Sequence, residues 1–416
     1  MIQSYSGEFT ISPMPLELSL NFCSHKCAYC FANLNNPKRT FDFNDTINSI
    51  KNSATSKLLK GYLLKEKYPI LLSNRVDPFA VSNYRQSLAM IDILNENGNK
   101  IAFQTKGGNG IDETLENLSY KAHWYISISF WDDNKRKLIE PGATSIQSRF
   151  ELIEKLIGLG HKVSVGINPL VEDWLPYSDF QSLYEKALSI GVKNFWIEGL
   201  HLNTKQVDNM TDRERNNIGR DVINEAKKRK TNTSYVRMCI NELRQVANVF
   251  SMNQPFKSDY FDEEHALYDG KSLKTTQDFI NHCFNKLPNG GIVTFNDYYN
   301  FMKQDFFELE FSDVDGYAYR IARNVYKKWG GSPFKTLKSV LEWYWTNEEV
   351  SKSIFQNNLF DILVYKDKDG NGMRYTSSSD KNWIAYFNAG KEISGFKFID
   401  LKKIDNFVSD TLFLNH

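Results

Sequence analysis

Cysteine is scarce in this chain, and so are excess charge and long apolar runs. Five cysteines among 416 residues are too few for a disulfide scaffold. Lys and Arg total 51 against 50 Asp and Glu, and this formal net charge of +1 neither requires nor excludes a polyanionic partner. No run approaches the roughly 20 apolar residues that cross a bilayer, and Met1–Thr10 is polar with no secretory signal after it. We therefore expect a cytoplasmic protein with no membrane span.

The composition is that of a folded protein. Apolar residues make up 41% and aromatic residues 14% of the chain, which is enough for a sizeable interior. The length suggests two or three domains. We place one domain at residues 1–205 and a mostly helical substrate or cap region at residues 206–416.

Short strands alternate with helices through the first half of the chain. The predicted strands are residues 16–22, 69–73, 100–105, 124–130, 162–168 and 193–198. The predicted helices between them are residues 43–65, 82–96, 111–121, 145–159 and 177–190. This alternation implies crossover connections and hence an α/β fold with a parallel sheet.

Within the strands, large apolar side chains alternate with small or polar ones. In residues 124–130 the second set is Tyr125, Ser127 and Ser129, and in residues 162–168 it includes Gly166 and Asn168. Strands buried between two helical layers would be apolar almost throughout. We therefore predict a curved sheet whose concave face holds a polar ligand; an open sheet with one solvated face is the alternative.

Polar residues also gather where the predicted strands end. In barrels of parallel strands, the functional groups lie at these strand ends. They are Ser73 and Asp77 after the second strand, Lys106 after the third, Ser129 after the fourth, Asn168 in the fifth and Glu198 in the sixth.

Three of the five cysteines crowd into the loop after the first predicted strand. Cys23, Cys27 and Cys30 have a spacing at which one loop can wrap a single metal centre. Three thiolates leave one iron of a [4Fe–4S] cluster open to a substrate or cofactor. The alternative is a zinc site completed by His25 or a distant residue, although no second pair of ligands follows at the usual spacing.

The loop Cys23-Ser-His-Lys-Cys27-Ala-Tyr29-Cys30 resembles the signature of the radical S-adenosylmethionine (SAM) superfamily. The resemblance covers about residues 15–200 and implies a partial (β/α)6 barrel. It also implies that SAM is cleaved reductively at the cluster to a 5′-deoxyadenosyl radical, which takes a hydrogen atom from the substrate. An electron donor such as flavodoxin or ferredoxin is implied as a partner.

The resemblance assigns SAM contacts by position. Tyr29 falls near the adenine, Lys106 is placed to pair with the SAM carboxylate, and Ser129 is placed to bond that carboxylate or the ribose. The full set of implied cofactor-binding residues is Tyr29, Ser73, Asp77, Lys106, Ser127, Ser129, Gly166, Asn168 and Glu198.

The segment after the second strand departs from the superfamily pattern. The usual Gly-Gly-Glu stretch is replaced by Ser73-Asn-Arg-Val-Asp77-Pro78-Phe79. This segment, with Glu140-Pro141 and Arg149 further on, is similar to the spore photoproduct lyase-like branch. That lyase has a hydrogen-donating cysteine beside its second strand, and this chain has none near Ser73, so the same reaction is not expected.

The second half of the chain resembles no family. Helices are predicted at residues 206–230, 235–250, 315–329 and 334–345. Cys239 is a candidate quencher of a substrate radical, although a lone helical cysteine is usually a small buried hydrophobe. Asp367-Lys-Asp369-Gly-Asn371-Gly372 matches the start of a calcium loop but lacks its final Glu, and it fits a hairpin turn better.

The leading hypothesis is a radical SAM enzyme that acts on a nucleic-acid base or a nucleotide-derived substrate. It depends on the branch resemblance and on basic, aromatic stretches such as residues 320–338, which are also compatible with a solvated helix face. The alternatives are a radical SAM enzyme acting on a peptide or small metabolite, and a zinc-stabilised binding module.

Overall fold

The structure is a computed structural model, and its chain divides into two compact units. The first holds Met1–Ser56, Lys60–Asn253 and Glu264–Ser272; the second holds the remainder, namely Lys57–Leu59, Gln254–Glu263 and Leu273–His416. The described residues are 2–3, 16–18, 20, 23–35, 43–56, 59–73, 76–227, 233–250, 291–293, 295–303, 338, 364–366, 372–374 and 396–398. The domain boundary at residue 205 stays a prediction.

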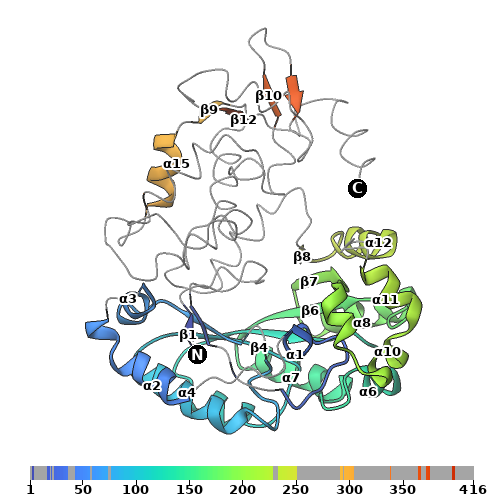
Figure 1. The fold of residues 1–416 in the computed structure, drawn as a ribbon, viewed down its shortest axis with the longest axis horizontal. Coiled ribbons are helices and arrows are strands. Elements are labelled where there is room, and N and C mark those ends of the chain that lie inside the picture. Colours follow the sequence, from blue (N-terminus) through green and yellow to red (C-terminus); the bar gives the residue numbers. More distant parts are fainter. Residues whose placement is uncertain are drawn as a thin grey trace. The chain divides into compact units, whose positions relative to one another are not determined.

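The first unit contains an eight-stranded sheet in the linear order β1 to β8 (Figure 1). The strands are β1 (Ile2–Gln3), β2 (Leu16–Leu18), β3 (Ile70–Leu72), β4 (Ile101–Thr105), β5 (His123–Ser127), β6 (Lys162–Leu170), β7 (Asn194–Gly199) and β8 (Asn248–Phe250). Strands β2 to β8 are parallel to their neighbours, and β1 pairs antiparallel with β2. The predicted α/β fold, with six parallel strands alternating with helices, is confirmed; β8 is a further strand.

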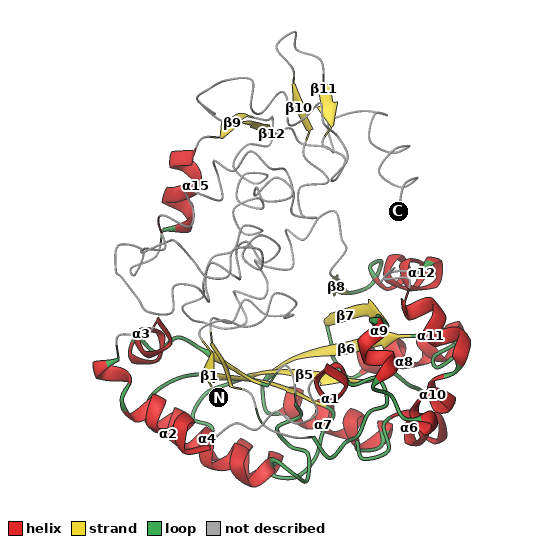
Figure 2. Cartoon of the chain, in the orientation of Figure 1, coloured by secondary structure: helices red, strands yellow, loops and turns green. Residues whose placement is uncertain are grey.

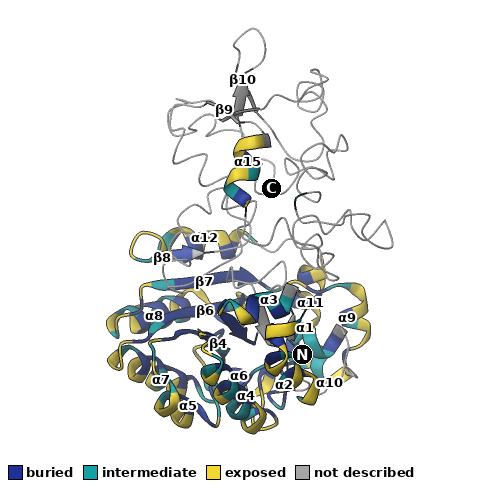
Figure 3. Ribbon diagram, turned by 90° about the vertical axis from the view of Figure 1, so that its left-hand side faces the viewer, coloured by how far each residue is buried: buried dark blue, intermediate teal, exposed yellow. Residues whose placement is uncertain are grey.

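Helices connect the strands and cover one face of the sheet. They are α1 (Phe31–Asn35), α2 (Phe43–Lys51), α3 (Leu59–Lys65), α4 (Tyr84–Glu96), α5 (Ile111–Asn117), α6 (Asp133–Ile139), α7 (Ile146–Gly158) and α8 (Tyr177–Ser189). Helices α2, α4 and α7 lie on the same side of the sheet in two perpendicular views (Figures 1 and 3). The strands between them are buried, while the outer sides of the helices are exposed (Figure 3).

The helix-facing side of the sheet is apolar, as its alternation predicts. Phe103 on β4 stacks on Trp124 of β5 with ring centroids 4.2 Å apart, and Phe79 lies 5.7 Å from the same indole. All three side chains are almost completely buried. Aromatic burial of this kind is a large favourable term in folding, so this cluster anchors the strands whose other face carries the polar residues.

Two long predicted helices are broken in the structure. The described residues of 43–65 form α2, a short 3-10 turn at Ser53–Thr55 and α3. Residues 206–227 fall in three short helices, and residues 228–230 lie outside the described residues. The three helices are α9 (Thr204–Asp208), α10 (Asp212–Ile218) and α11 (Arg220–Lys227). Thr211 begins α10 with a capping box, and Gly219 ends it with a φ of +93° that favours glycine.

The predicted helix at residues 235–250 is also shorter than expected. It ends at Leu243 in α12 (Ser234–Leu243), and the chain then forms β8. Strand β8 pairs with β7 in the register Asn194↔Asn248. Pairing with an existing strand edge is a tertiary effect that overrides local helical preference.

The second unit is described only in short elements. Strand β9 (Gly291–Val293) pairs with β12 (Phe396–Phe398), and helix α15 (Phe295–Met302) follows β9. Strands β10 (Val364–Lys366) and β11 (Gly372–Arg374) pair antiparallel, as the predicted hairpin requires, and both are drawn in yellow in Figure 2. Its turn, Cys283 and the predicted helix at residues 315–329 lie outside the described residues, as does nearly all of the predicted helix at residues 334–345. Within the described part of the chain, no helix is long and apolar enough to span a membrane.

Candidate functional site

The three clustered cysteines lie in the loop between β2 and α1, at the carboxyl edge of the sheet. Cys23 and Cys27 are buried and Cys30 is partly exposed. The Cys30 amide donates to the Cys27 carbonyl oxygen at 3.0 Å, and Lys26 between the first two cysteines has a φ of +51°. The loop therefore turns tightly, and it carries three thiols, the donor type that holds [4Fe–4S] clusters.

The thiols influence one another and their buried surroundings. Burial raises the pKa of Cys23 to about 12, and the charge of Asp77 raises it further. Burial also raises the pKa of Cys27, where Glu140 and the other two cysteines act in the same direction. The thiols are thus protonated when free, and a bound metal would displace their protons. No three His, Cys, Asp or Glu of the described ranges converge closely enough to hold a single metal ion.

Backbone contacts fix the cysteine loop to the segment 139–142. The Ala28 amide donates to the Ile139 carbonyl oxygen at 2.9 Å, and the Gly142 amide donates to the His25 carbonyl oxygen at 2.9 Å. A Cβ atom on Gly142 would lie 2.3 Å from the Ser24 carbonyl oxygen, so only glycine allows this close approach. The loop position is therefore set by a segment more than 100 residues away in sequence.

The loop after β3 holds the cysteine loop on another side. The Ser24 amide donates to the Ser82 hydroxyl at 3.1 Å, and the Ser82 amide donates to the Ser24 hydroxyl at 3.2 Å. This reciprocal pair links residues 58 positions apart, and neither serine is predicted from the sequence as part of the site.

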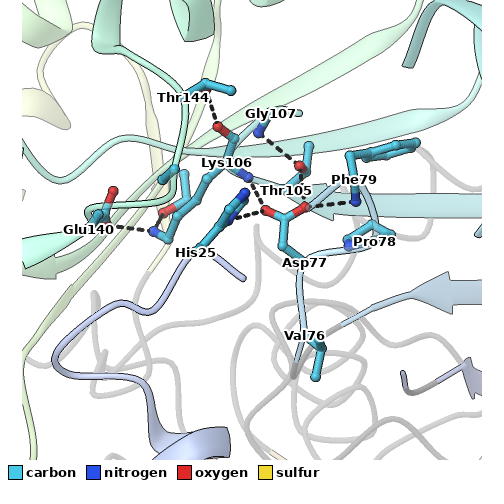
Figure 4. A network of polar contacts seen from close by, with 12 residues as sticks. His25, Val76, Asp77, Pro78, Phe79, Thr105, Lys106, Gly107, Glu140 and Thr144 are labelled. Atoms are coloured by element: carbon cyan, nitrogen blue, oxygen red, sulfur yellow. Dashed lines mark hydrogen bonds and ion pairs between the residues drawn. The ribbon is translucent and has the colours of Figure 1, made fainter. Parts of the chain in front are cut away.

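Asp77 links the loop after β3 to the end of β4 through hydrogen bonds from both of its carboxylate oxygens (Figure 4). Its Oδ1 accepts from the Phe79 amide at 3.0 Å and from the Thr105 hydroxyl at 2.8 Å, and its Oδ2 accepts from the Lys106 amide at 2.6 Å. Both oxygens thus fix the backbone that carries Lys106. The predicted role of Asp77 in cofactor binding stays a prediction.

His25 faces the same carboxylate. Its Nδ1 lies 3.4 Å from Oδ2 of Asp77, a distance compatible with an ion pair but longer than a good hydrogen bond. Burial lowers the pKa of His25, although the charge of Asp77 opposes this effect. The imidazole is therefore neutral near pH 7, and we regard the contact as packing rather than a salt bridge.

A buried carboxylate, Glu140, joins three elements next to the cysteine loop. Its Oε1 lies 2.8 Å from Lys106 Nζ and also accepts from the Tyr29 hydroxyl, and its Oε2 accepts from Arg149 Nη2 at 2.7 Å. Burial alone would raise the pKa of Glu140, but the charges of Lys106 and Arg149 hold it well below its usual range. Glu140 is therefore ionised although it is fully buried.

Lys106 emerges from the end of β4 with its ammonium in this network. Nζ donates to the Ser127 hydroxyl at 2.7 Å and lies 5.6 Å from the Tyr29 ring centroid. The Tyr29 ring in turn lies 5.7 Å from that of Trp174. The structure thus brings together three predicted site residues, Tyr29, Lys106 and Ser127, beside the cysteine loop.

Arg149 on α7 connects the network to the backbone of β5 and of the segment before α7. Its Nη1 donates to the Ser127 carbonyl oxygen at 2.8 Å, and its Nε and Nη2 donate to the Thr144 carbonyl oxygen. The Thr144 hydroxyl donates to the Lys106 carbonyl oxygen at 2.5 Å. The sequence analysis names Glu140 and Arg149 only within the branch resemblance and does not predict them as site residues, because neither lies on a strand whose alternation could reveal it.

Two predicted site serines are buried, but only one of them has a hydrogen-bond partner among the described residues. The Ser129 hydroxyl is completely buried and has no hydrogen-bond partner among the described residues. Such a group normally finds a partner, so its orphaned hydroxyl fits a bound ligand. Ser73 is also buried, and its hydroxyl accepts from the Val76 amide at 3.4 Å.

The remaining predicted contacts surround Tyr125 on the polar face of the sheet. A Cβ atom on Gly166 would lie 1.8 Å from the Tyr125 hydroxyl, so the ring occupies the space that glycine leaves. Burial raises the pKa of Tyr125, the Glu198 charge adds to this, and a hydrogen bond with Asn168 opposes it. Gly166, Asn168 and Glu198 therefore lie together around a tyrosine that the sequence places on this face but does not single out.

Cys239 lies in α12, away from the three clustered cysteines in the chain. It is buried and hydrogen-bonded to Tyr235, whose hydroxyl donates to the Leu175 carbonyl oxygen at 2.5 Å. Burial raises its pKa to about 12, so the thiol is protonated. These contacts fit packing against the segment before α8, and its role as a radical quencher stays a prediction.

No protein-family model matches the chain, and no curated protein matches it by sequence. Among solved structures, Streptococcus suis SuiB bound to S-adenosylmethionine is similar at a TM-score of 0.39 and 11% identity, over 58% of this chain and 51% of that one. Spore photoproduct lyase complexed with a dinucleoside spore photoproduct is similar at 0.38 and 14%, over 57% and 77%. The chain thus spans about half the length of SuiB, and the likeness to both enzymes is distant and does not resolve a branch.

Proposed function

We propose that the chain is a radical SAM enzyme. The observation that carries this proposal is the position of the C-x3-C-x2-C loop: it lies at the carboxyl edge of a parallel sheet, beside Lys106 and its buried network. Ligand sites of parallel α/β sheets lie at this edge. A lone cysteine loop is open to several interpretations, whereas this loop lies beside the partly exposed Lys106 ammonium, which is a suitable partner for a ligand carboxylate.

In this proposal Cys23, Cys27 and Cys30 hold a [4Fe–4S] cluster. When bound, the cluster and SAM supply a carbon radical that takes a hydrogen atom from the substrate. The barrel residues bind and orient the reactants and exclude water from that radical. A flavodoxin or ferredoxin supplies the electron.

Lys106 is the proposed partner of the SAM carboxylate. Its ammonium has three hydrogens, and its contacts with the described residues use two of them, on Glu140 and Ser127. The third hydrogen remains for a ligand oxygen. The orphaned hydroxyl of Ser129 supplies a second donor on the same strand-end surface.

Anaerobic reconstitution with iron and sulfide tests the cluster. We expect about four irons per chain, a broad visible absorption, and an electron paramagnetic resonance (EPR) signal after reduction that changes when SAM is added. Cys30→Ala should lose the cluster, while Cys239→Ala, a matched control outside the motif, should retain it. A chain that binds one zinc and no iron under these conditions would contradict the proposal.

For the substrate we propose a nucleic-acid base or nucleotide-derived molecule. Its support is the sequence segment Ser73–Phe79 with Glu140-Pro141, since the basic stretch at residues 320–338 lies almost wholly outside the described residues. A base in a duplex would have to be flipped out to reach a radical formed inside a barrel. We expect retention on immobilised DNA that falls steeply with salt. Retention no greater than that of a neutral control protein would favour a peptide or small metabolite instead.

A further inference from the structure

We infer that Glu140 is a positioning residue that couples the cysteine loop to the ligand-binding lysine. The inference rests on the proposed function, because it assigns Glu140 a role toward SAM at the same site. Glu140 is absent from the sequence-predicted SAM contacts, and it does not itself need to touch SAM. Its role would act through Lys106 and Tyr29.

One carboxylate oxygen performs the coupling. Oε1 of Glu140 lies 2.8 Å from Lys106 Nζ and accepts from the Tyr29 hydroxyl. Tyr29 directly precedes Cys30 in the cysteine loop, and Lys106 directly follows β4. A shift of the cysteine loop that moves Tyr29 therefore alters the anchor of Lys106. Figure 4 shows Glu140 and Lys106 pointing toward each other from two different segments.

Arg149 fixes the position of the other carboxylate oxygen of Glu140, Oε2. Its Nη2 lies 2.7 Å from Oε2, and both side chains are completely inaccessible to solvent. Because the guanidinium also donates to the Ser127 and Thr144 carbonyl oxygens, it is rigidly held. The orientation of the Glu140 carboxylate is thus fixed before a ligand arrives.

The backbone around Glu140 is tied to the cysteine loop independently of its side chain. Its amide donates to the Arg136 carbonyl oxygen at 2.6 Å, and its carbonyl oxygen accepts from Arg136 Nη1 at 2.9 Å. The neighbouring Ile139 and Gly142 bond to Ala28 and His25 of the loop. Two separate sets of contacts therefore join segment 139–142 to the loop, and only one of them passes through the carboxylate.

The charges distinguish positioning from simple packing. Lys106 and Arg149 are two cations with Glu140 between them. Replacing the carboxylate by an amide leaves the two cations without this counter-charge, and their repulsion favours a displaced Lys106. Positioning therefore predicts that the effect of Glu140 on SAM binding disappears when Lys106 carries no charge.

The test is a double-mutant cycle on SAM affinity, measured anaerobically on cluster-reconstituted protein without reductant, so that SAM is not consumed. We expect Glu140→Gln and Lys106→Met each to weaken SAM binding about tenfold or more, as loss of a charge-assisted contact does. The double variant should bind no more weakly than Lys106→Met alone. Wild-type affinity in Glu140→Gln, or multiplied losses in the double variant, would overturn the inference.

A milder variant keeps the test decisive if Glu140→Gln fails to fold. Tyr29→Phe removes only the hydroxyl that donates to Glu140. We expect it to retain its iron, to weaken SAM binding by about threefold, and to add nothing in the Lys106→Met background. An unchanged affinity would overturn the coupling. If the wild-type protein holds a cluster but binds no SAM, the proposed function itself fails, an outcome distinct from any failure confined to the variants.

Discussion

The two edges of one polar sheet face carry different chemistry. At the amino edge, His123 of β5 contacts the Ser164 hydroxyl at 2.9 Å, and the Asn248 side chain donates to that of Asn194 at 3.0 Å. These paired groups are neutral, although Lys162, opposite His123 on β6, also carries a charge at this edge. At the carboxyl edge the same face carries a cation, Lys106, that belongs to a buried network spanning a loop, a strand and a helix.

This difference separates stability from function within one sheet. A neutral pair between neighbouring strands stabilises the sheet, and its hydrogen-bonding groups are satisfied without a ligand. At the carboxyl edge, the completely buried Ser129 hydroxyl has no partner among the described residues, which is costly unless a ligand supplies one. Barrels of parallel strands concentrate function at the carboxyl edge and stability at the amino edge, and the ion network of Lys106, Glu140 and Arg149 lies at the carboxyl edge.

The largest expected effect comes from breaking the carboxyl-edge network. Arg149→Met removes one partner of a fully buried ion pair, and we expect it to cost about 3–5 kcal/mol of unfolding free energy. Urea denaturation of the apoprotein measures this loss. A cost below about 1 kcal/mol would show that the network contributes no more than a surface ion pair.

The next effect depends on pH and belongs to the amino edge. Burial lowers the pKa of His123 from 6.5 to about 3, and the charge of Lys162 acts in the same direction. The unfolded chain therefore binds the proton first, and stability contributed by neutral His123 is present above pH 6.5 and falls as pH drops toward 3. Between pH 7 and pH 4 we expect a loss of about 3 kcal/mol, at about 1.4 kcal/mol for each pH unit below 6.5.

The control for this pH dependence is His123→Gln, which cannot titrate. Between pH 7 and pH 4, the unfolding free energy of the wild type should fall more steeply with decreasing pH than that of the variant. Parallel curves for the two proteins would mean that the pKa of His123 is the same in the folded and unfolded states.

A smaller effect is expected at the exposed pair between β7 and β8. Asn248→Ala removes one neutral hydrogen bond to Asn194 and should cost about 1 kcal/mol, while leaving SAM binding unchanged. Chemical denaturation and SAM titration of the same preparation check both statements. A loss of SAM affinity would show that the two edges are not functionally separate.

The smallest effect on stability is expected for Ser129→Ala. Because its buried hydroxyl has no partner among the described residues, its removal should change the unfolding free energy by less than about 0.5 kcal/mol. SAM affinity should nevertheless fall by about threefold or more. A clear destabilisation with unchanged SAM binding would assign this serine to packing.

The sheet could be predicted from sequence because its signal is local. Alternation with period two in β5 and β6 identified the polar face and placed Ser127 and Ser129 on it. The breaks between α9, α10 and α11 were missed, although Thr211 with Glu214 and the following Gly219 gave usable local signals.

The buried network could not be derived in the same way. Glu140 lies at the end of a short helix, Arg149 in the middle of another, and Lys106 beyond a strand. Their meeting depends on how three crossover connections pack, which no periodicity records. Strand β8 could not be predicted for the same reason, because it forms by pairing with the edge of β7 rather than through a preference of its own residues.

The most direct test of the central claim is the fate of SAM in the anaerobically reconstituted and reduced protein. The account predicts 5′-deoxyadenosine and methionine from the wild type and neither from Cys30→Ala. A wild-type protein that holds its cluster, is reduced, and leaves SAM intact, or a Cys30→Ala protein that still forms 5′-deoxyadenosine, would contradict it.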